Sequence, residues 1–355
     1  MGSFDTNRLI TKSHIWFFAV FAAVVAAGAW YGVAHIPAAT YQHVRLPMAR
    51  VATPAGIFRD VDWINDGALV TGFDPDARSV SDPHSIWWLQ RDGSAMKIID
   101  LPPDPSPDCR STNFLSPTSM RDGGIAFVRW CYGHPDSIRL MRYDPLTDGV
   151  VPLFPYKVPA AYGSFSFAAG RPPLFGQGSG IIDQIYTLEP EGPSQLNLGM
   201  VTAEGPRWSP DGQRFVFSGK EHIKGKPGPD WSVVPRDVWI MPGDCVADPE
   251  RCADVKPQRL FPSAKSLYGA KWSPHNTWIA TSGDMGKGRE GVWLYNESSG
   301  ALFLVDNTGD FGVGAWSPDG QTLALIGPPD TPVLAERGRN GLYLLNVSSV
   351  IGAKH

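Results

Sequence analysis

The chain has 355 residues, 43% of them hydrophobic and 11% aromatic, so it can bury a large core and is not a disordered chain. Its formal net charge is −4 with both signs mixed and no long basic run, which argues against nucleic acid as a partner. The 38 glycines and 33 prolines are spread along the chain, as expected for many short strands joined by turns.

The N-terminal part predicts a single transmembrane helix. Residues 15–33 carry no charge, and as a helix they would reach about 28 Å, close to the hydrocarbon thickness of a bilayer. Trp16 marks one end of this stretch and Trp30 the other, where amphipathic rings favour the interface. The predicted organisation is a cytoplasmic tail at residues 1–14, the helix at 15–34 and a linker at 35–54.

A cleaved signal peptide is the alternative for this segment. Its apolar core would run only about 7–15 residues and end in small residues before the cut. The run here is longer, and residues 34–39 make a poor cleavage site. The basic residues on the two sides of the helix are nearly balanced, so charge alone does not orient it.

The cysteines favour an orientation with the N-terminus in the cytoplasm and the main domain in the periplasm or extracellular space. All four follow the predicted helix, and none lies in a C-x-x-C pattern: Cys109, Cys131, Cys245 and Cys252. Two disulfides in an oxidising compartment fit this number. Pairing between sequence neighbours is the simplest of three connectivities, and four buried thiols remain the alternative.

The predicted helix also carries small residues that would let another membrane helix approach closely. Three alanines recur at every fourth position and a G-x-x-x-G follows: Ala19, Ala23, Ala27, Gly28 and Gly32. Alanine is also ordinary filler in membrane helices. If the face is used, the expected partners are membrane proteins of a larger complex, within the lipid bilayer.

A repeated hairpin is the strongest pattern in the sequence. Three plain copies of Trp-Ser-Pro begin at Trp208, Trp272 and Trp316, and two of them continue as Asp-Gly-Gln. Proline presets the backbone of such a turn and glycine supplies its positive φ angle. Alternating residues then form the next strand. Each copy therefore predicts two antiparallel strands.

Weaker copies precede these three, so six units are expected. Their anchor residues lie 41 to 64 positions apart: Trp63, Leu115, Phe167, Trp208, Trp272 and Trp316. Such spacings are typical of four-stranded propeller blades with loop insertions. We expect the tryptophans Trp63, Trp208, Trp272 and Trp316 to be structural, packed between neighbouring blades.

Two further strands recur in the same phase as the hairpin. One begins near residues 86, 138, 185, 238, 292 and 342, and an outer one near 96, 150, 195, 259 and 302. The sixth unit lacks an outer strand, and an open ring would leave an unpaired edge. We predict that residues 41–47 supply it. The fold class is then all-β, a six-bladed β-propeller of four-stranded antiparallel blades at residues 55–355, preceded by one transmembrane helix.

The W-S-P-D-G hairpins resemble the repeats of TolB-type propellers, which also occur in the N-terminal domain of prolyl-oligopeptidase-like enzymes. The resemblance covers about residues 55–350, is specific in the last three units and loose in the first three. It implies a six-bladed propeller, often periplasmic, that works as a platform for binding proteins.

Motifs for chemistry are not found. The sequence has no G-x-S-x-G elbow, no H-E-x-x-H, no P-loop and no EF-hand loop, so no catalytic, cofactor or metal residues are assigned. The longest insertion, residues 220–231, is basic and ends in an aromatic residue, which suits protein contact. If it is used, the expected contact residues are Lys224, Lys226 and Trp231, and a tolerated surface insertion is the alternative.

These observations predict a non-enzymatic, membrane-tethered interaction module outside the cytoplasm, a scaffold or accessory subunit of a larger membrane protein complex. The alternatives are a propeller enzyme, such as a lactonase or glycan-processing hydrolase, and a module that senses small ligands or glycans. A metal or a polar cluster in the mouth of the central channel would favour one of these alternatives.

Overall fold

We describe the protein from a computed structural model. The described residues are 41–53, 56–64, 67–75, 84–99, 109, 112–131, 138–156, 158, 162–178, 183–221, 235–275, 277–329 and 339–352. Residues 42–355 form one compact unit. Within the described residues no helix has the length and apolar character needed to cross a membrane. The predicted tail and transmembrane helix, residues 1–34, lie outside them.

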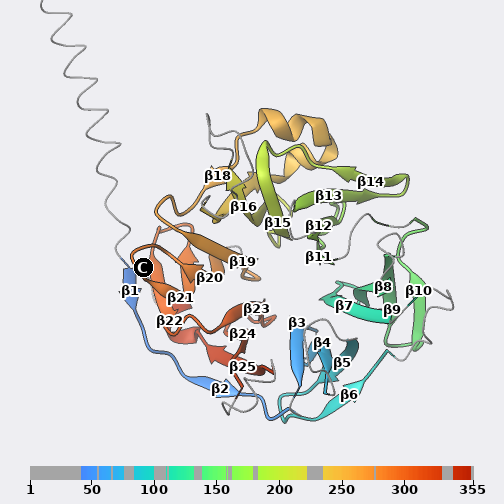
Figure 1. Cartoon of the computed structure of the whole chain (residues 1–355), viewed down its shortest axis with the longest axis horizontal. Coiled ribbons are helices and arrows are strands. Elements are labelled where there is room, and N and C mark those ends of the chain that lie inside the picture. The colour runs from blue at the N-terminus through green and yellow to red at the C-terminus, as the bar shows by residue number, and fades with distance from the viewer. Residues whose placement is uncertain are drawn as a thin grey trace, which may run out of the picture. The chain divides into compact units, whose positions relative to one another are not determined.

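Six antiparallel sheets form the blades of a ring (Figure 1). Blade one has β3 (Ile57–Trp63), β4 (Leu69–Asp74), β5 (Ser85–Leu89) and β6 (Ala95–Lys97). Blade two has β7 (Thr112–Ser119), β8 (Ile125–Cys131), β9 (Arg139–Asp144) and β10 (Gly149–Pro152). Blade three has β11 (Tyr162–Ser166), β12 (Leu174–Gly178), β13 (Gln184–Glu189) and β14 (Gly192–Gln195).

The other three blades follow the same order from the axis outward. Blade four has β15 (Met200–Trp208), β16 (Arg214–Glu221), β17 (Asp237–Pro242) and β18 (Gln258–Arg259). Blade five has β19 (Ser266–Trp272), β20 (Trp278–Asp284), β21 (Glu290–Asn296) and β22 (Leu302–Asp306). Blade six has β23 (Gly312–Trp316), β24 (Thr322–Gly327) and β25 (Gly341–Asn346). Two short 3-10 helices, η3 (Gly243–Ala247) and η4 (Pro249–Asp254), precede β18, and α3 (Ser348–Ile351) follows β25.

The predicted six-bladed, four-stranded architecture is confirmed. The first strands of successive blades contact one another around the ring, and β23 of blade six contacts β3 of blade one. The core lies between the blades rather than inside any one of them. Phe58 and Phe73 of blade one, for example, pack in one cluster with Ala315 and Leu342 of blade six. Each blade lies between two others, so its middle strands are buried on both faces, as residues Leu69–Phe73 of β4 are.

The W-S-P-D-G segments form the predicted hairpin turns between the first two strands of a blade. In blade four the hydroxyl of Ser209 lies 2.6 Å from a carboxylate oxygen of Asp211, which also accepts the N–H of Gln213 at 3.0 Å. The N–H of Gly212 donates to the carbonyl oxygen of Ser209, and its φ is +68°, a conformation glycine adopts without strain. Blade six repeats the serine–aspartate contact and the positive-φ glycine.

The ring is closed by an N-terminal strand, but not the predicted one. Strand β2 (Met48–Arg50) pairs with β25 and becomes the outer strand of blade six. The predicted segment, residues 41–47, instead contributes β1 (Tyr41–His43), which adds a fifth strand to blade five beside β22. Blade five already has its own outer strand, so the chain passes along it before reaching the open edge. The carbonyl of Pro47 then accepts the N–H of Asn346 at 3.0 Å.

Blade two corrects a second expectation, the anchor position at Leu115. In its hairpin turn, the N–H of Met120 donates a hydrogen bond to the carbonyl oxygen of Gly124. In the turn of blade one, the equivalent bond runs from the N–H of Ile64, the residue after Trp63, to the carbonyl oxygen of Ala68. The residue before the turn is therefore Ser119, which occupies the place of a blade tryptophan. The ladder between β7 and β8 is irregular between residues 115 and 118. Proline at position 117 has no N–H to donate, which accounts for the irregularity.

Candidate functional site

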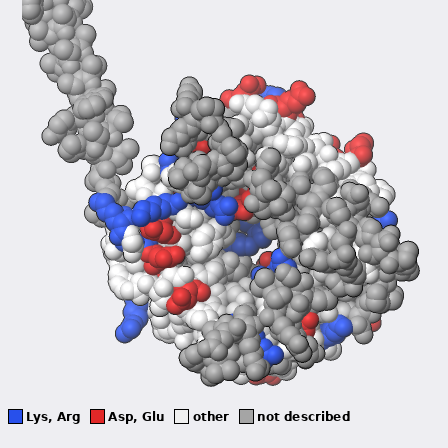
Figure 2. All heavy atoms as spheres, in the orientation of Figure 1, with Lys and Arg blue, Asp and Glu red and all other residues white. Residues whose placement is uncertain are grey.

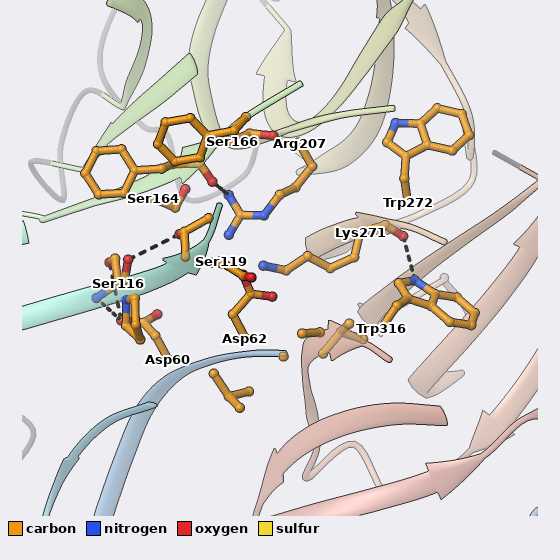
Figure 3. Close-up of a pocket in the computed structure, with 18 of the residues that line it drawn as sticks. Asp60, Asp62, Ser116, Ser119, Ser164, Ser166, Arg207, Lys271, Trp272 and Trp316 are labelled. Carbon is orange, nitrogen blue, oxygen red and sulfur yellow. Dashed lines mark hydrogen bonds between the residues drawn. The ribbon is translucent and has the colours of Figure 1, made fainter. Parts of the chain in front are cut away.

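The axis of the ring collects charged side chains from three blades. Asp62 in β3, Arg207 in β15 and Lys271 in β19 each come directly before the tryptophan of their hairpin. Side chains alternate along a strand. When the tryptophan turns toward the neighbouring blade, the residue before it is left to face the axis. Figure 3 shows the three side chains pointing toward one another across the channel.

These residues line a cavity of about 270 Å³. Blades two and three supply its hydroxyl groups: Ser116, Thr118, Ser119, Ser164 and Ser166. Blade six, which faces blade three across the ring, supplies a small apolar wall that includes Val313, Gly314 and Ala315. The cavity therefore has a charged and hydroxylated part and an apolar part. Figure 2 shows the ring hollowed at its centre, with basic and acidic atoms visible inside.

Hydrogen bonds between blades hold the two acids of β3. A carboxylate oxygen of Asp62 accepts the N–H of Ser119 at 2.8 Å, and Asp60 accepts the N–H of Ser116 at 3.2 Å. Both serines belong to β7, so blade two positions the acids of blade one. Burial raises the pKa of Asp62, while the Ser119 N–H and the positive charges of Lys271 and Arg207 oppose that rise.

The two cations are held differently. One guanidinium nitrogen of Arg207, Nη1, donates to the carbonyl oxygens of Phe165 at 2.7 Å and Pro206 at 2.9 Å. The ammonium group of Lys271 makes no hydrogen bond or ion pair with any described residue, and Lys271 lines the first cavity. Arg207 is therefore fixed by the blades, and Lys271 is free to bond to something in the cavity.

The enclosure lowers the pKa of both cations. Burial lowers the pKa of Lys271 to about 7, helped by the nearby Arg207 guanidinium and opposed by Asp62 and Asp60. Burial likewise lowers the pKa of Arg207. An amine with such a pKa exchanges its proton near neutral pH, so its charge responds to whatever occupies the cavity.

A second cavity of about 470 Å³ continues the channel. It shares the residues Arg59, Asp60, Ser116 and Ser164 with the first. Here Glu204 of β15 forms an ion pair with Arg236, with an oxygen–nitrogen distance of 2.6 Å. Burial raises the pKa of Glu204 to about 7, which Arg236 opposes and Asp183 reinforces.

The predicted structural tryptophans lie at the seams between blades. The indole N–H groups of three of them donate to the preceding blade: Trp63 to Ala315 at 3.2 Å, Trp208 to Pro172 at 3.1 Å, and Trp316 to Lys271 at 3.1 Å. Trp272 is equally buried, lies under the guanidinium of Arg214 from blade four, and its indole nitrogen has no hydrogen-bond partner. Trp208, Trp272 and Trp316 also line the first cavity.

The cysteines pair with their neighbours in sequence, the simplest of the connectivities considered. Cys109 bonds to Cys131, joining the approach to β7 with the end of β8. Cys245 bonds to Cys252, joining η3 to η4. The structure thus removes the alternative of four free thiols.

The other predicted site residues fall outside the described part of the chain. They are the helix residues Ala19, Ala23, Ala27, Gly28 and Gly32 and the loop residues Lys224, Lys226 and Trp231. Within the described residues, no three histidine, cysteine, aspartate or glutamate side chains gather as a metal ion would require. Sequence reasoning did not single out Asp62, Arg207 or Lys271, although their place before a hairpin tryptophan was a usable signal.

Comparisons with known proteins bear on the fold. No protein-family model matches the sequence, and no curated protein matches it. Among solved structures, TolB from Acinetobacter baumannii is similar with a TM-score of 0.51 at 15% identity, covering 82% of this chain and 63% of its own. The fold is TolB-like. This chain therefore spans less than two thirds of that TolB.

A second solved structure is similar to this chain in fold. It is XC5397 from Xanthomonas campestris, described as a gluconolactonase, with a TM-score of 0.50 at 13% identity, covering 85% of this chain and 91% of its own. At such identities the likeness concerns the fold alone. Proteins that share a propeller differ in function according to the residues in their sites.

Proposed function

We propose that this protein is a non-enzymatic interaction module held at the outer face of a membrane, an accessory subunit of a larger membrane protein complex. The observation that carries the proposal is how the ring is closed. Strands β1 and β2 build the N-terminal segment into blades five and six. Only residues 35–40 separate β1 from the apolar segment 15–34, a reach of roughly 20 Å.

The consequence of this short connection is a ring that cannot move far from a membrane-embedded segment. A propeller whose first two strands, β1 and β2, join its blades directly after the anchor is suited to recognition close to the bilayer. The two disulfides support an oxidising compartment for the ring, since such bonds persist in the periplasm and outside cells.

Two surfaces are proposed to meet the partner. One is the small-residue face of the segment 15–34, including Ala19 and Ala23. The other is the insertion between β16 and β17, with Lys224, Lys226 and Trp231, because a tryptophan is a common anchor of protein interfaces and the two lysines beside it can steer an acidic partner.

The experiment is affinity purification of the tagged full chain in mild detergent, followed by mass spectrometry. Three variants are compared: deletion of residues 1–36, the pair Ala19→Leu and Ala23→Leu, and the triple K224A/K226A/W231A. Membrane proteins that co-purify with the parent and are lost from the paired leucine variant support docking through the helix. Loss from the triple variant alone places recognition on the loop.

A clean monomer in the parent sample at endogenous expression would overturn the accessory-subunit function. An exposed control, Lys256→Gln, should behave like the parent in every comparison, since Lys256 lies on the surface before β18. This control separates a specific loss of contacts from a general effect of removing positive charge.

A second function, binding of a small ligand in the channel, is favoured by a specific observation. The charged cavity of about 270 Å³ encloses Asp62, Arg207 and Lys271, a cluster that packing of the blades alone does not require. Enclosed polar groups that converge beside apolar walls are the usual form of a small-molecule site. The two functions are compatible, because the ligand would occupy the axis and the partner the membrane side or a loop.

A further inference from the structure

The first cavity is lined by more cationic than acidic side chains. Its charged lining consists of Arg59, Asp60, Asp62, Arg207 and Lys271, three cations and two acids. The acids are already bonded to the N–H groups of blade two. One cation, Lys271, has no hydrogen bond or ion pair among the described residues. An anionic ligand group would give the ammonium group of Lys271 a partner.

The positions of the two cations suit one anionic group between them. Figure 3 shows the Arg207 guanidinium and the Lys271 ammonium directed at the same part of the channel. Arg207 uses Nη1 for two carbonyl oxygens, so its planar group is oriented before a ligand arrives. A preoriented guanidinium is well matched to the two oxygens of a carboxylate. The ammonium of Lys271 adds a second charge from a different blade.

The rest of the lining specifies the remainder of such a ligand. Asp60 and Asp62 keep lone pairs that accept from hydroxyl or amide donors, and the hydroxyls of Ser119 and Ser164 can donate or accept. The wall of Val313 and Ala315 leaves room for a short carbon chain. The lining therefore fits a small acid that also has polar groups.

We infer that the channel binds a small polar carboxylate, with the carboxylate between Lys271 and Arg207 and its hydrogen-bond donors directed at Asp60 and Asp62. This inference rests on the ligand-binding function proposed above. The carboxylate comes either from a free acid, such as a sugar acid or dicarboxylic acid, or from the C-terminus of a peptide. The chemistry recognised at the two cations is the same in both cases.

Binding should be coupled to a proton. Lys271 faces Arg207 from β15 and Asp60 and Asp62 from β3, and burial together with Arg207 holds its pKa near 7 without ligand. A bound carboxylate favours the charged amine, so Lys271 takes up a proton when the ligand enters above pH 7. A site that recognised only neutral groups would show no such uptake.

The test is isothermal titration calorimetry of the full chain in detergent at pH 6.5 and pH 8. The probes are three pairs of an acid and a neutral analogue: gluconate and sorbitol, succinate (a dianion at both pH values) and 1,4-butanediol, and N-acetyl-tetraalanine and its C-terminal amide. Measurements at pH 8 in Tris and in HEPES, whose protonation enthalpies differ, report the protons taken up.

The expected result is that one acid binds at least tenfold more tightly than its neutral partner and takes up close to one proton at pH 8. Lys271→Met should weaken that acid at least tenfold, Lys271→Arg should retain it, and the exposed control Lys256→Gln should leave it unchanged. Preference for gluconate or succinate indicates a free acid, and preference for the peptide acid indicates a chain terminus.

Two results would overturn the inference in distinguishable ways. If neutral probes bind as well as their acids, or if Lys271→Met has no effect, the channel binds a ligand but not through an anion. If none of the six probes binds to the parent at either pH, the ligand-binding function fails together with the inference. Circular dichroism of each variant confirms that a lost signal does not come from a lost fold.

Discussion

The indole N–H of Trp316 donates a hydrogen bond of 3.1 Å to the backbone carbonyl of Lys271. The bond crosses from blade six to blade five. Its acceptor belongs to the residue whose ammonium group enters the channel. The same strand segment therefore serves the seam between two blades with its backbone and the axial cavity with its side chain. A change in the packing between blades five and six at Trp316 is therefore expected to move the side chain of Lys271 in the channel.

Replacement of this tryptophan tests the seam. Trp316→Phe removes the donor and leaves a carbonyl oxygen of Lys271 without this partner, so we expect the free energy of unfolding to fall by about 1–3 kcal/mol beyond the loss of ring area. Trp272→Phe is the matched control: Trp272 is as buried as Trp316, but its indole nitrogen has no partner. Urea unfolding followed by fluorescence measures both.

The expected order is a clearly larger loss for Trp316→Phe than for Trp272→Phe. Equal losses in the two variants would mean that the indole bond of Trp316 adds nothing to the packing of its ring.

A pH dependence is expected from Lys271. Its folded pKa of about 7 lies below its ordinary value of 10.5, so between these values the unfolded chain binds more protons than the folded one. Stability from this group therefore rises with pH above 7, by at most about 1.4 kcal/mol per pH unit. Lys271→Met removes the buried charge and should be more stable than the parent at pH 6.

Thermal unfolding of the parent and Lys271→Met from pH 6 to pH 9.5 checks this prediction. The advantage of the variant should shrink steadily above pH 7, while Lys256→Gln should follow the parent throughout. A constant difference between variant and parent across the whole range would contradict a lowered pKa for Lys271.

Much of the ring was predictable because the determinants of a blade are local. A turn of Ser-Pro-Asp-Gly needs only the serine, the aspartate and a glycine with positive φ, all within four residues, and the structure contains these contacts at Ser209 and Ser317. The later strands of each blade were visible as short apolar runs for the same reason. Six copies in one order then imply a ring.

The errors occurred where local patterns were weak. In blade two, serine stands at the tryptophan position and Pro117 disturbs the ladder, so Leu115 was the more prominent apolar residue. For the closing strand, both β1 and β2 are only three residues long and mostly exposed, and their choice of partner depends on which edge the chain reaches first. The local sequence of these segments determines neither the turn position in blade two nor the strand that closes the ring.

The channel cluster could not be found by motif. Asp62 and Lys271 are 209 positions apart, and only closure of the ring brings β3 and β19 to one axis. In the sequence, each of the two is simply a charged residue that precedes a tryptophan at the end of a strand. Once a propeller is expected, however, the residue before each hairpin tryptophan is a rational place to look, because alternation along the strand directs it to the axis.

Glu204 should give a pH dependence of the opposite sign. Its folded pKa of about 7 lies above its ordinary value of 4.5, so between these values the folded chain binds more protons than the unfolded one. Stability from this group is therefore lost as pH rises from about 4.5 to 7. Glu204→Gln resembles the protonated form and still offers an oxygen to Arg236, so its urea midpoint should fall less over this range.

Glu250→Gln, at an exposed position in η4, is the control for the midpoints of Glu204→Gln between pH 4.5 and pH 7.5. Parallel curves for the parent and both variants would show that Glu204 titrates normally and would argue against burial as the cause of its raised pKa.

The two disulfides should differ in their contributions. They close loops with sequence separations of 22 and 7 residues. The chain-entropy relation gives about 3.4 kcal/mol for the longer loop and about 2.4 kcal/mol for the shorter one. We expect C109A/C131A to lower the free energy of unfolding by roughly 1 kcal/mol more than C245A/C252A. Urea unfolding of both double variants measures the difference, and a reversed order would show that packing of Cys245 and Cys252 outweighs loop entropy.

Removal of the N-terminal strands in two steps tests how the ring is closed. Deletion of residues 1–43 removes β1 (Tyr41–His43), which is only a fifth strand on a complete blade, and keeps the buried Leu46, so its cost should be small. Deletion of residues 1–51 also removes β2 and the bonds from Val51 to Leu342 and from Asn346 to Pro47. This second deletion exposes the edge of β25 and should cost roughly 3 kcal/mol more at about 1 kcal/mol per hydrogen bond, together with buried Val51.

Urea unfolding and sedimentation measure stability and association, because a bare sheet edge can pair with another chain. If both deletions unfold at the same urea concentration and stay monomeric, β2 does not close the ring, and the side chain of Asn340, which bonds to the backbone of Phe58 at 2.6 and 2.7 Å, holds blades six and one together without it.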